Sequence, residues 1–439
     1  MPPADNSTFG AREVASLFAP IEDARRIALA VSGGPDSLAL LLLAERWRAA
    51  HGGVPEIDVF TVDHRLHPRS AEDAAFVVRL AEERGFRARV LVREGDPPRT
   101  GIEAAAREAR YRLLIDAAKA VGASHMVLAH HQDDQAETFL MRLARGSGVH
   151  GLAAMRPLRA REGVMLFRPL LGVTRARLAA LVGEEGIVAV DDAANRDPRF
   201  MRTKLRALMP ELTRAGLGPE QLAEAARQMA RVADAIDAQA SALLRQAVHV
   251  DRFAIVTLDT AVYREALEEV RLRALTRLLQ AIGGGVYPPR GEKLKALDMA
   301  LTGVEGVRFR RTLAGAVAER AGSAVLLYRE IGRSGLPVVP VTGSFEGLWD
   351  NRFHLAVTNP SPFGIAVGQL GVPGLRRAGA AERLPKPALA ALPAIWRGDK
   401  LLAAPALDFV AGGAGMAAEA ECVLGVRIFG SKEGPATVN

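Results

Sequence analysis

A glycine-rich segment near the start of the chain has the composition of a loop that binds phosphate. It contains, in order, Ser32, Gly33, Gly34, Pro35, Asp36 and Ser37. Adjacent glycines let the backbone approach phosphate oxygens, and the start of a helix offers N–H groups and a positive dipole to an anion. Asp36 would repel a polyphosphate unless a cation lay between them, so we assign it to Mg²⁺. The alternative is a tight turn capped by a short polar side chain.

The loop lacks the Walker pattern, GxxxxGK followed by Ser or Thr, and it has no lysine that could grip a γ-phosphate. Its sequence SGGPDS instead resembles the PP-loop of the N-type ATP pyrophosphatases. Members of that group cleave ATP between the α- and β-phosphates, transfer AMP to an oxygen and release pyrophosphate. The resemblance therefore implies ATP, together with Mg²⁺, as the cofactor.

A second polar cluster combines two histidines with carboxylates. Asp133 and Glu137 are four positions apart, so on a helix they project from one face, where opposing carboxylates would bind a metal cation or an ammonium group. His130 and His131 just before them could be metal ligands, proton shuttles or helix caps. A zinc site is disfavoured, because no cysteines accompany the histidines and the pattern HExxH is absent. The alternative is a solvated helix start, which acidic residues suit.

The elements that must position these residues alternate as in repeated βαβ units. Apolar runs predict strands at Ile27–Val31, Ile57–Val62, Ala88–Val92, His125–Ala129 and Met165–Pro169. Amphipathic runs predict helices at Ser37–Ala50, Ser70–Arg84, Glu103–Val121 and Asp134–Leu143. The predicted fold class is α/β, a doubly wound parallel sheet of the Rossmann-like type. Because ligands bind at the carboxyl ends of such strands, the loops after Val31, Val62 and Ala129 should share one crevice.

Turn-forming residues predict where this first domain ends. Pro210 and the stretch from Gly216 to Pro219 mark the boundary. Beyond it we expect helices and then strands, at Glu220–Val248, Arg264–Ala281, Arg290–Leu301, Val307–Leu313, Ala316–Glu319, Ala324–Tyr328, Phe353–Val357 and Val423–Phe429. We therefore expect three domains: a catalytic domain over 1–215, a helical and α+β middle domain over 216–332, and a small β-rich C-terminal domain over 333–439.

Composition sets limits on the partners. The formal net charge of +7 permits a polyanionic partner, since Lys and Arg neutralise phosphates, and the excess is not gathered in a tail. Met1–Gly10 has no secretory pattern and no run is long enough to span a bilayer, so we expect a cytoplasmic protein without a membrane partner. The single cysteine, Cys422, excludes an internal disulfide and a CxxC redox pair.

Five separated segments together resemble the bacterial tRNA(Ile)-lysidine synthetases. They are SGGPDS at Ser32–Ser37, VDHRL at Val62–Leu66, GIEAAAREARYR at Gly101–Arg112, HHQDDQAETFLMRLARGSGVHGL at His130–Leu152 and DDAANRDPRFMRTKLRALMP at Asp191–Pro210. The resemblance is dense over residues 26–210 and looser beyond them. In the fifth segment Ala194, Phe200 and Thr203 replace a serine, a tyrosine and an asparagine that are common in the family, which weakens inferences about hydrogen bonds there.

The resemblance implies a ligase that adenylates the C2 oxygen of the wobble cytidine in the CAU anticodon of tRNA(Ile), after which the ε-amine of free lysine displaces AMP. By matching motifs, the catalytic residues are Asp36 at the metal, Asp133 and Glu137 at the lysine, and Arg202 near the reacting phosphate or the tRNA. Further residues complete the expected site. ATP is expected to contact the loop from Ser32 to Ser37 with Asp63, His64 and Arg110, and the substrates are expected to contact His130, His131 and Arg206.

Several of these residues have a simpler alternative role. Asp63 and His64 could only cap a strand. Arg107, Arg110 and Tyr111 share a predicted helix face with Glu103, and an ion pair between Glu103 and Arg107 is the alternative. The basic run suits tRNA phosphates or a solvated loop; it comprises Arg196, Arg199, Arg202, Lys204 and Arg206. Trp349 and Trp396 are expected in a core rather than on a tRNA surface.

Three rival functions share parts of this pattern. A PP-loop tRNA thiolase would use the same loop, but such enzymes generally use cysteines, and Cys422 lies far from the loop in sequence. An amidotransferase-type synthetase would need an N-terminal catalytic cysteine, and Pro2 follows Met1 here. A catalytically inactive RNA-binding relic is disfavoured by the intact Asp36, Asp133 and Glu137. A homodimer is left open by the sequence.

Overall fold

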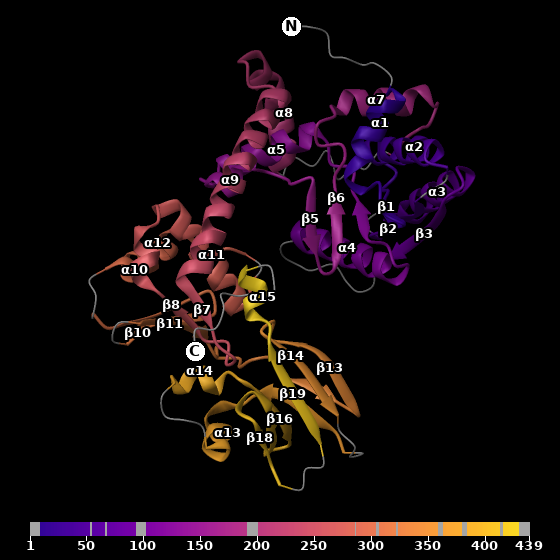
Figure 1. Cartoon of the computed structure of the whole chain (residues 1–439). Helices are drawn as coiled ribbons and strands as arrows, with labels where there is room; N and C mark the ends of the chain where they lie inside the picture. Colours follow the sequence, from indigo (N-terminus) through magenta and orange to yellow (C-terminus); the bar gives the residue numbers. More distant parts are fainter. Residues whose placement is uncertain are drawn as a thin grey trace. The chain divides into compact units, whose positions relative to one another are not determined.

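The protein was analysed as a computed structural model that describes residues 9–52, 55–65, 68–93, 102–190, 201–285, 287–303, 307–321, 324–358, 363–379, 384–412 and 416–429. Contacts between residues divide the chain into two compact units, Met1–Ala233 and Asp234–Asn439 (Figure 1). The phosphate loop and the histidine and carboxylate cluster both belong to the first unit. The expected division into three domains, at 215/216 and 332/333, stays a prediction.

The first unit is built on a six-stranded sheet with the order β3-β2-β1-β4-β6-β5. Its strands are β1 Arg26–Ala30, β2 Glu56–Asp63, β3 Arg87–Val92, β4 His125–Val127, β5 Leu158–Arg161 and β6 Val164–Phe167. All neighbouring pairs are parallel except β5 with β6, which form an antiparallel hairpin. The doubly wound α/β fold and its five predicted strands are confirmed, whereas the edge strand β5 was not predicted.

The strand order places a topological switch point at β1. This strand pairs with β2 on one side and with β4 on the other, so the connections leave it in opposite directions. A crevice opens at such a point outside the carboxyl ends of the two diverging strands. The loop that follows β1 and the loop that follows β4 therefore lie across this crevice from each other.

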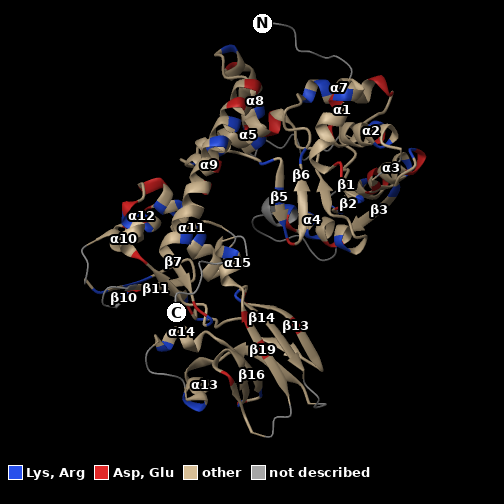
Figure 2. Ribbon diagram, in the orientation of Figure 1, with Lys and Arg blue, Asp and Glu red and all other residues tan. Residues whose placement is uncertain are grey.

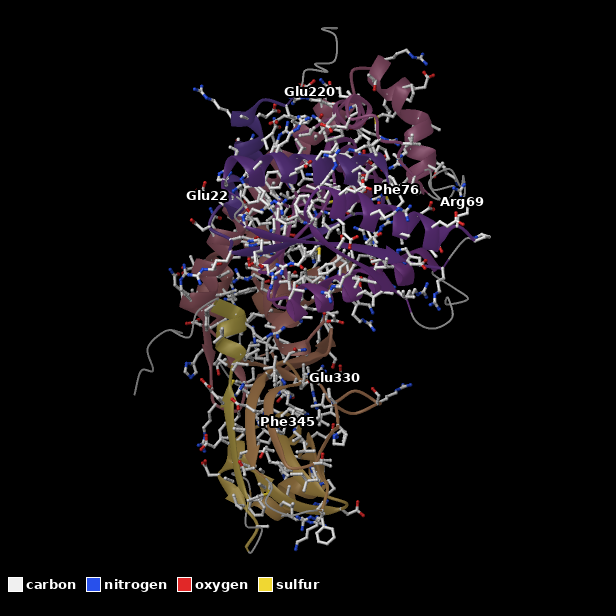
Figure 3. The ribbon with its side chains drawn as sticks, turned by 90° about the vertical axis from the view of Figure 1, so that its right-hand side faces the viewer. Glu22, Arg69, Phe76, Glu220, Glu330 and Phe345 are labelled. Atoms are coloured by element: carbon white, nitrogen blue, oxygen red, sulfur yellow. The ribbon has the colours of Figure 1, made fainter. Side chains whose placement is uncertain are left out.

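Helices cover both faces of the sheet. One face buries Ile27 and Leu29 of β1 beneath α1 Ala11–Phe18, α2 Pro35–Ala50, α3 Ser70–Glu83 and α7 Arg175–Glu184. The other face packs Ala28 and Phe60 against α4 Ile102–Ala120. Helix α2 is buried around most of its circumference, which explains its long leucine run. Charged side chains such as Glu22 and Arg69 lie at the margins of the unit (Figure 3).

Three helices extend from the carboxyl side of the sheet. They are α5 Gln132–Leu143, α8 Met201–Arg214 and the first part of α9 Pro219–Ala247, and the short α6 Val149–Leu152 lies between the first two in sequence. A small apolar cluster that includes Phe139 and Leu222 joins them. Helix α8 continues through Pro210 and ends before Gly216, whose φ is +85°.

The second unit contains three sheets. Their orders are β7-β8-β11-β10-β9, β12-β15-β16-β17-β18 and β13-β14-β19. The first sheet comprises β7 Val248–Val250, β8 Val256–Leu258, β9 Phe309–Leu313, β10 Ala316–Ala321 and β11 Ala324–Arg329. The second comprises β12 Val339–Val341, β15 Ile365–Gln369, β16 Pro393–Arg397, β17 Lys400–Ala404 and β18 Phe409–Val410. The third comprises β13 Ser344–Trp349, β14 Phe353–Thr358 and β19 Ala417–Cys422.

The helices of the second unit depart from the sequence expectation in several places. They are α10 Thr260–Glu265, α11 Glu268–Gly283, α12 Gly291–Thr302, α13 Gly371–Ala378, α14 Lys386–Ala390 and α15 Leu424–Phe429. The single helix expected over Arg264–Ala281 is wrong, because the backbone is extended at Ala266 and Leu267, and a new helix starts with two acidic residues.

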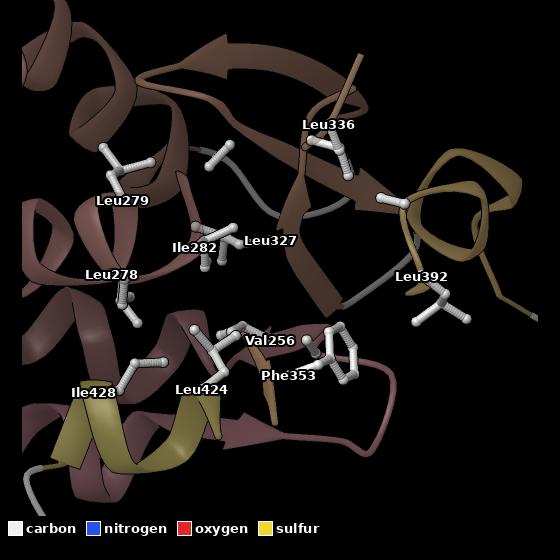
Figure 4. Packing of buried hydrophobic residues seen from close by; sticks show 14 of the residues in the cluster. Val256, Leu278, Leu279, Ile282, Leu327, Leu336, Phe353, Leu392, Leu424 and Ile428 are labelled. Carbon is white, nitrogen blue, oxygen red and sulfur yellow. The ribbon is translucent and has the colours of Figure 1, made fainter. Parts of the chain in front are cut away.

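The strand expected at Val423–Phe429 is also wrong. This segment is helix α15, and Leu424 and Ile428, four positions apart, are both fully buried. They face Leu278 of α11 in the close view (Figure 4). The β-branched residues favoured a strand, but the burial follows the helical period.

The tryptophans lie where the sequence analysis placed them. Trp349 is buried, and its indole N–H donates to the carbonyl of Pro337 at 2.9 Å. Trp396 packs partly buried against the same core. Among the described helices, none combines the length and the apolar character that a membrane crossing requires.

Candidate active site

The phosphate loop is held open by glycines and serines. Gly33 has a φ of +85°, and an added Cβ would lie 2.9 Å from Cγ2 of Val190. Its carbonyl accepts a hydrogen bond from the Val190 N–H at 2.9 Å. Ser37 Oγ accepts from the Ser32 N–H at 3.1 Å and donates to the Gly34 carbonyl at 2.9 Å. Pro35 begins α2 with Gly34 as its N-cap, so the helix start faces the loop as an anion site requires.

Asp36 has the free oxygen that a metal ligand needs. Within the described part of the chain its Oδ1 atom is buried and has no hydrogen-bond partner. No group of three or more acidic, His or Cys side chains forms a metal cage among these residues. Mg²⁺ commonly uses one or two carboxylates and takes its other ligands from substrate phosphates and water. The residues present therefore fit a Mg²⁺ ion that enters with ATP.

His131 connects the phosphate loop to the acidic cluster. Its Nε2 atom lies 3.4 Å from Asp36 Oδ2, and its Nδ1 atom lies 3.5 Å from Asp133 Oδ2. Nε2 is also 3.6 Å from Oδ2 of Asp134, which accepts from the His131 N–H and caps α5. Burial opposes protonation of His131, but the nearby carboxylates of Asp133, Asp36 and Asp134 outweigh burial and raise its pKa to about 10. The imidazolium therefore holds the two halves of the site together.

Asp133 and Glu137 project from α5 toward different neighbours. Asp133 Oδ2 accepts a hydrogen bond from the Arg175 N–H, at the start of α7, at 2.9 Å. Burial works against ionisation of Asp133, but the bonds from His131 and from Arg175 lower its pKa. Glu137 is buried and forms a two-point ion pair with Arg206 of α8, with Nε–Oε1 at 2.5 Å and Nη2–Oε2 at 3.4 Å.

Several arginines lie close to His130 and to one another. Burial lowers the pKa of Arg110, and the charges of Arg107 and Arg202 act in the same direction. Among the described residues Arg110 has no ion-pair partner, so its charge is available to an anion. Burial lowers the pKa of His130 to about 3. The negative charge of Asp134 acts against this shift, and the positive charges of Arg168, Arg107 and Arg110 add to it. His130 is therefore a neutral imidazole, in contrast to His131.

The remaining predicted residues fall into two groups. Asp63 ends β2, is buried, and accepts from the Arg65 N–H at 2.8 Å, while the neighbouring His64 is half-buried. Both follow a strand adjacent to β1. Arg196 and Arg199 lie outside the described residues, as does the side chain of Glu103, so the proposed ion pair with Arg107 is not described. Lys204 is exposed on α8. Basic residues occur on helices of both units (Figure 2).

Three participants were missed by the sequence analysis. Asp134 touches His131 and lies 3.9 Å from Arg206. The N–H of Arg175 belongs to α7, a helix that was not predicted. Arg168 is buried, and its Nη1 donates to the Arg156 carbonyl at 2.9 Å. Asp134 caps α5 in the structure, but the sequence did not mark it, because the capping-box pattern has Ser or Thr followed by Glu or Gln rather than His followed by Asp.

Comparison with known proteins identifies the family of the chain. A family model described as "PP-loop domain" matches residues 7–212. The chain is 43% identical over 343 residues to a tRNA(Ile)-lysidine synthase of Bradyrhizobium sp., a match that covers 73% of this chain and 94% of that protein. It is 37% identical over 383 residues to a tRNA(Ile)-lysidine synthase of Ruegeria pomeroyi, covering 87% of this chain and 88% of that protein.

Among solved structures, a U34-tRNA thiolase from Methanococcus maripaludis aligns with a TM-score of 0.43 and 15% identity, over 51% of this chain and 76% of that one. The high identities over nearly the whole length of the curated relatives, together with the PP-loop and the acidic cluster at one crevice, define the relationship. The chain belongs to the tRNA(Ile)-lysidine synthase family.

Proposed function

We propose that the protein joins free L-lysine to C2 of the wobble cytidine in the CAU anticodon of tRNA(Ile), through an adenylated tRNA, with release of pyrophosphate and AMP. Family membership supports the reaction as a whole. One observation carries its assignment to this crevice: His131 contacts both Asp36 and Asp133. The phosphate-binding half and the ammonium-binding half are therefore close enough to serve one reaction.

The first half-reaction transfers AMP from ATP to the C2 oxygen of the cytidine. The loop from Ser32 to Ser37 would hold the phosphates, and Asp36 would hold Mg²⁺, which neutralises phosphate charge when bound. Asp63 and His64, at the end of β2, would line the nucleotide pocket. Arg110, whose charge has no carboxylate partner among the described residues, would bind the phosphate oxygens.

The second half-reaction forms a C–N bond and breaks a C–O bond. The ε-amine of lysine, after losing a proton, attacks C2, and the former C2 oxygen leaves with AMP. Asp133 and Glu137 would hold the ammonium groups of lysine, and His131 would keep Asp133 oriented. His130, a neutral imidazole beside this group, completes the substrate pocket. Positioning supplies much of the acceleration, because activation has already made the oxygen a good leaving group.

The tRNA would bind along the basic side of this site. Arg202 and Arg206 on α8 stand beside Glu137, and Lys204 is exposed on the same helix. We propose that α8 contacts the anticodon arm near the reacting base and that residues 333–439 form a further tRNA-binding module. The substrates of this reaction are those of the cytoplasm, where we expect the protein to act. A homodimer stays a prediction.

A single assay tests this proposal. The full-length protein is incubated with ATP, Mg²⁺, radiolabelled lysine and a set of tRNA transcripts, and the label retained by each tRNA is counted. We expect label only in the isoleucine tRNA with the CAU anticodon. If no tRNA takes up lysine, and AMP release instead depends on added sulfide, the thiolase is the correct function. Absence of pyrophosphate release under every condition would favour the inactive RNA-binding relic.

The metal assignment has its own test. Asp36→Ala should abolish pyrophosphate release, because the loop then lacks its carboxylate ligand for Mg²⁺. The protein should stay folded, with a lower melting temperature than the wild type, because the substitution removes one of the carboxylates that face the buried His131 but leaves Asp133 and Asp134 in place. Glu22→Ala, at an exposed acidic residue outside the site, is the matched control. Undiminished pyrophosphate release by Asp36→Ala would contradict the assignment.

A further inference from the structure

We infer that Arg206 determines specificity for a cationic side chain by occupying the place on Glu137 that the ammonium group of lysine takes during the reaction. The inference rests on the proposed function, in which Glu137 binds lysine. We call this place the ammonium seat; it is the pair of carboxylate oxygens of Glu137. Without lysine the guanidinium fills the seat, and lysine enters by exchange of one cation for another.

The contacts of Glu137 show that its seat is filled. Both of its oxygens face Arg206, at 2.5 Å from Nε and 3.4 Å from Nη2. Arg202, one helical turn earlier on α8, reaches only 3.9 Å with its Nε atom. Each carboxylate oxygen can accept a second hydrogen bond, but the side chain of Glu137 is only 3% exposed, and Arg206 lies against both oxygens. We therefore infer that an ammonium group reaches these oxygens only when Arg206 moves aside.

The two partners differ in their freedom to move. The side chain of Glu137 is 3% exposed, whereas that of Arg206 is 32% exposed. Arg206 can therefore withdraw toward water, and Glu137 must stay. Pro210 lies four residues after Arg206 in α8 and has no N–H, so it cannot donate the usual helical hydrogen bond to the Arg206 carbonyl. The turn that carries Arg206 is thus held by fewer bonds than a regular helix provides.

Charge makes the exchange selective. Withdrawal of Arg206 without a replacement would leave a buried carboxylate uncompensated, which is strongly unfavourable. An ammonium of similar charge restores the balance, but a neutral side chain of the same length does not. Arg206 after release remains within a turn of Arg202, where a phosphate of ATP or tRNA can receive it. Entry of lysine would in this way release a second arginine toward the reacting phosphate.

The inference is tested by whether substitution of Arg206 strengthens or weakens the binding of lysine. Isothermal titration calorimetry measures lysine binding to the full-length wild type, to Arg206→Ala and to Arg206→Gln. Because the competing cation is gone, both variants should bind lysine about tenfold more tightly. Weaker binding by both would overturn the inference, because it would mean that Arg206 assists lysine rather than competes with it. Arg206→Gln can keep a hydrogen bond to Glu137 and serves if the alanine variant fails to fold.

Three controls separate this inference from the proposed function. Arg214→Ala, at an exposed arginine near the end of α8, should leave lysine affinity unchanged. Glu137→Gln should weaken it about tenfold or more; unchanged affinity would refute Glu137 as the lysine site itself. Loss of affinity in both Glu137→Gln and Arg206→Gln would refute only the exchange. Guanidinium ions at millimolar concentration should compete with lysine in Arg206→Ala, and a lack of competition would count against a shared seat.

Discussion

At the scale of single residues, the site is a set of carboxylates whose charges are shared among a few cations. His131 contacts both Asp36 and Asp133, and Arg206 forms an ion pair with Glu137. The sequence motifs predicted the carboxylates and the loop as site residues, and the structure brings Asp36 and Asp133 together at His131. They named Arg206 as a site residue but could not pair it with Glu137, and they did not predict the contact of the Arg175 N–H with Asp133, because these partners lie 69 and 42 residues further along the chain. Such pairings depend on how α7 and α8 pack, which local patterns do not encode.

Gly33 provides a test of the loop conformation. Gly33→Ala requires a left-handed backbone for alanine and also presses its Cβ onto Val190. We expect the free energy of unfolding to fall by about 2–4 kcal/mol. We also expect ATP binding to be lost. Gly122→Ala is the matched control, because Gly122 has a similar φ of +74° but open space around its Cβ position. Urea denaturation should show a cost of only about 1–2 kcal/mol for the control. Equal costs for the two variants would mean that Val190 yields easily.

We expect substitution of Arg110 to lower pyrophosphate release while changing the free energy of unfolding little. It lies among like charges and has no ion pair among the described residues, so Arg110→Met removes repulsion and keeps the apolar stem. We expect the free energy of unfolding to stay within about 1 kcal/mol of the wild type or to rise. Pyrophosphate release should fall about a hundredfold or more, since a charge aimed at the phosphates is lost. A large loss of stability with normal turnover would show that Arg110 is structural.

At the scale of elements, periodicity predicted the parallel sheet well and failed where an element is short or polar. Strand β1 carries a continuous apolar run from Ile27 to Ala30, and β2 is mostly buried and contains the apolar run Val59–Phe60, because both faces of the sheet are covered. Strand β5 is almost wholly exposed and has no apolar pattern, so its hairpin with β6 could not be foreseen. Helix α15 was misassigned because β-branched side chains outweighed a helical spacing only six residues long.

Two substitutions in α15 distinguish a helix from a strand. On a strand Leu424, Val426 and Ile428 would share one face, whereas on the helix Val426 is 37% exposed and the other two are buried. Ile428→Ala should therefore cost about 2–5 kcal/mol of unfolding free energy. Val426→Ala should cost less than about 1 kcal/mol. Chemical denaturation of both variants gives the comparison, and similar costs would support the strand.

At the scale of the whole molecule, the chain is basic and its contacts divide it into two compact units, with the division after Ala233, inside the continuous helix α9. A helix with no break offers no local signal of such a division. The three domains expected from turn residues, with a boundary after residue 215, stay a prediction. The net charge of +7 belongs to the whole chain, so its effect on the binding of a polyanion is expected for the full-length protein.

Binding of tRNA should depend steeply on salt. Each phosphate contact releases counterions from the nucleic acid, so a basic protein with several contacts loses affinity as salt rises. Between about 50 and about 200 mM KCl we expect the affinity for tRNA to fall about ten- to a hundredfold, measured by filter binding. Binding of free lysine should change far less, because its sheltered partner Glu137 is poorly screened. A flat salt profile for tRNA would argue against an electrostatic surface.

The half-buried Cys422 at the end of β19 has a practical consequence for experiments on this chain. Burial raises the pKa of its thiol, so at neutral pH it stays in the weakly reactive protonated form. Because the sequence contains no second cysteine, a new one introduced at an exposed position such as Lys204 would react with a fluorescent maleimide far faster than the native thiol. The natural chain is therefore a ready background for attaching a single dye to α8 and following its motion during turnover.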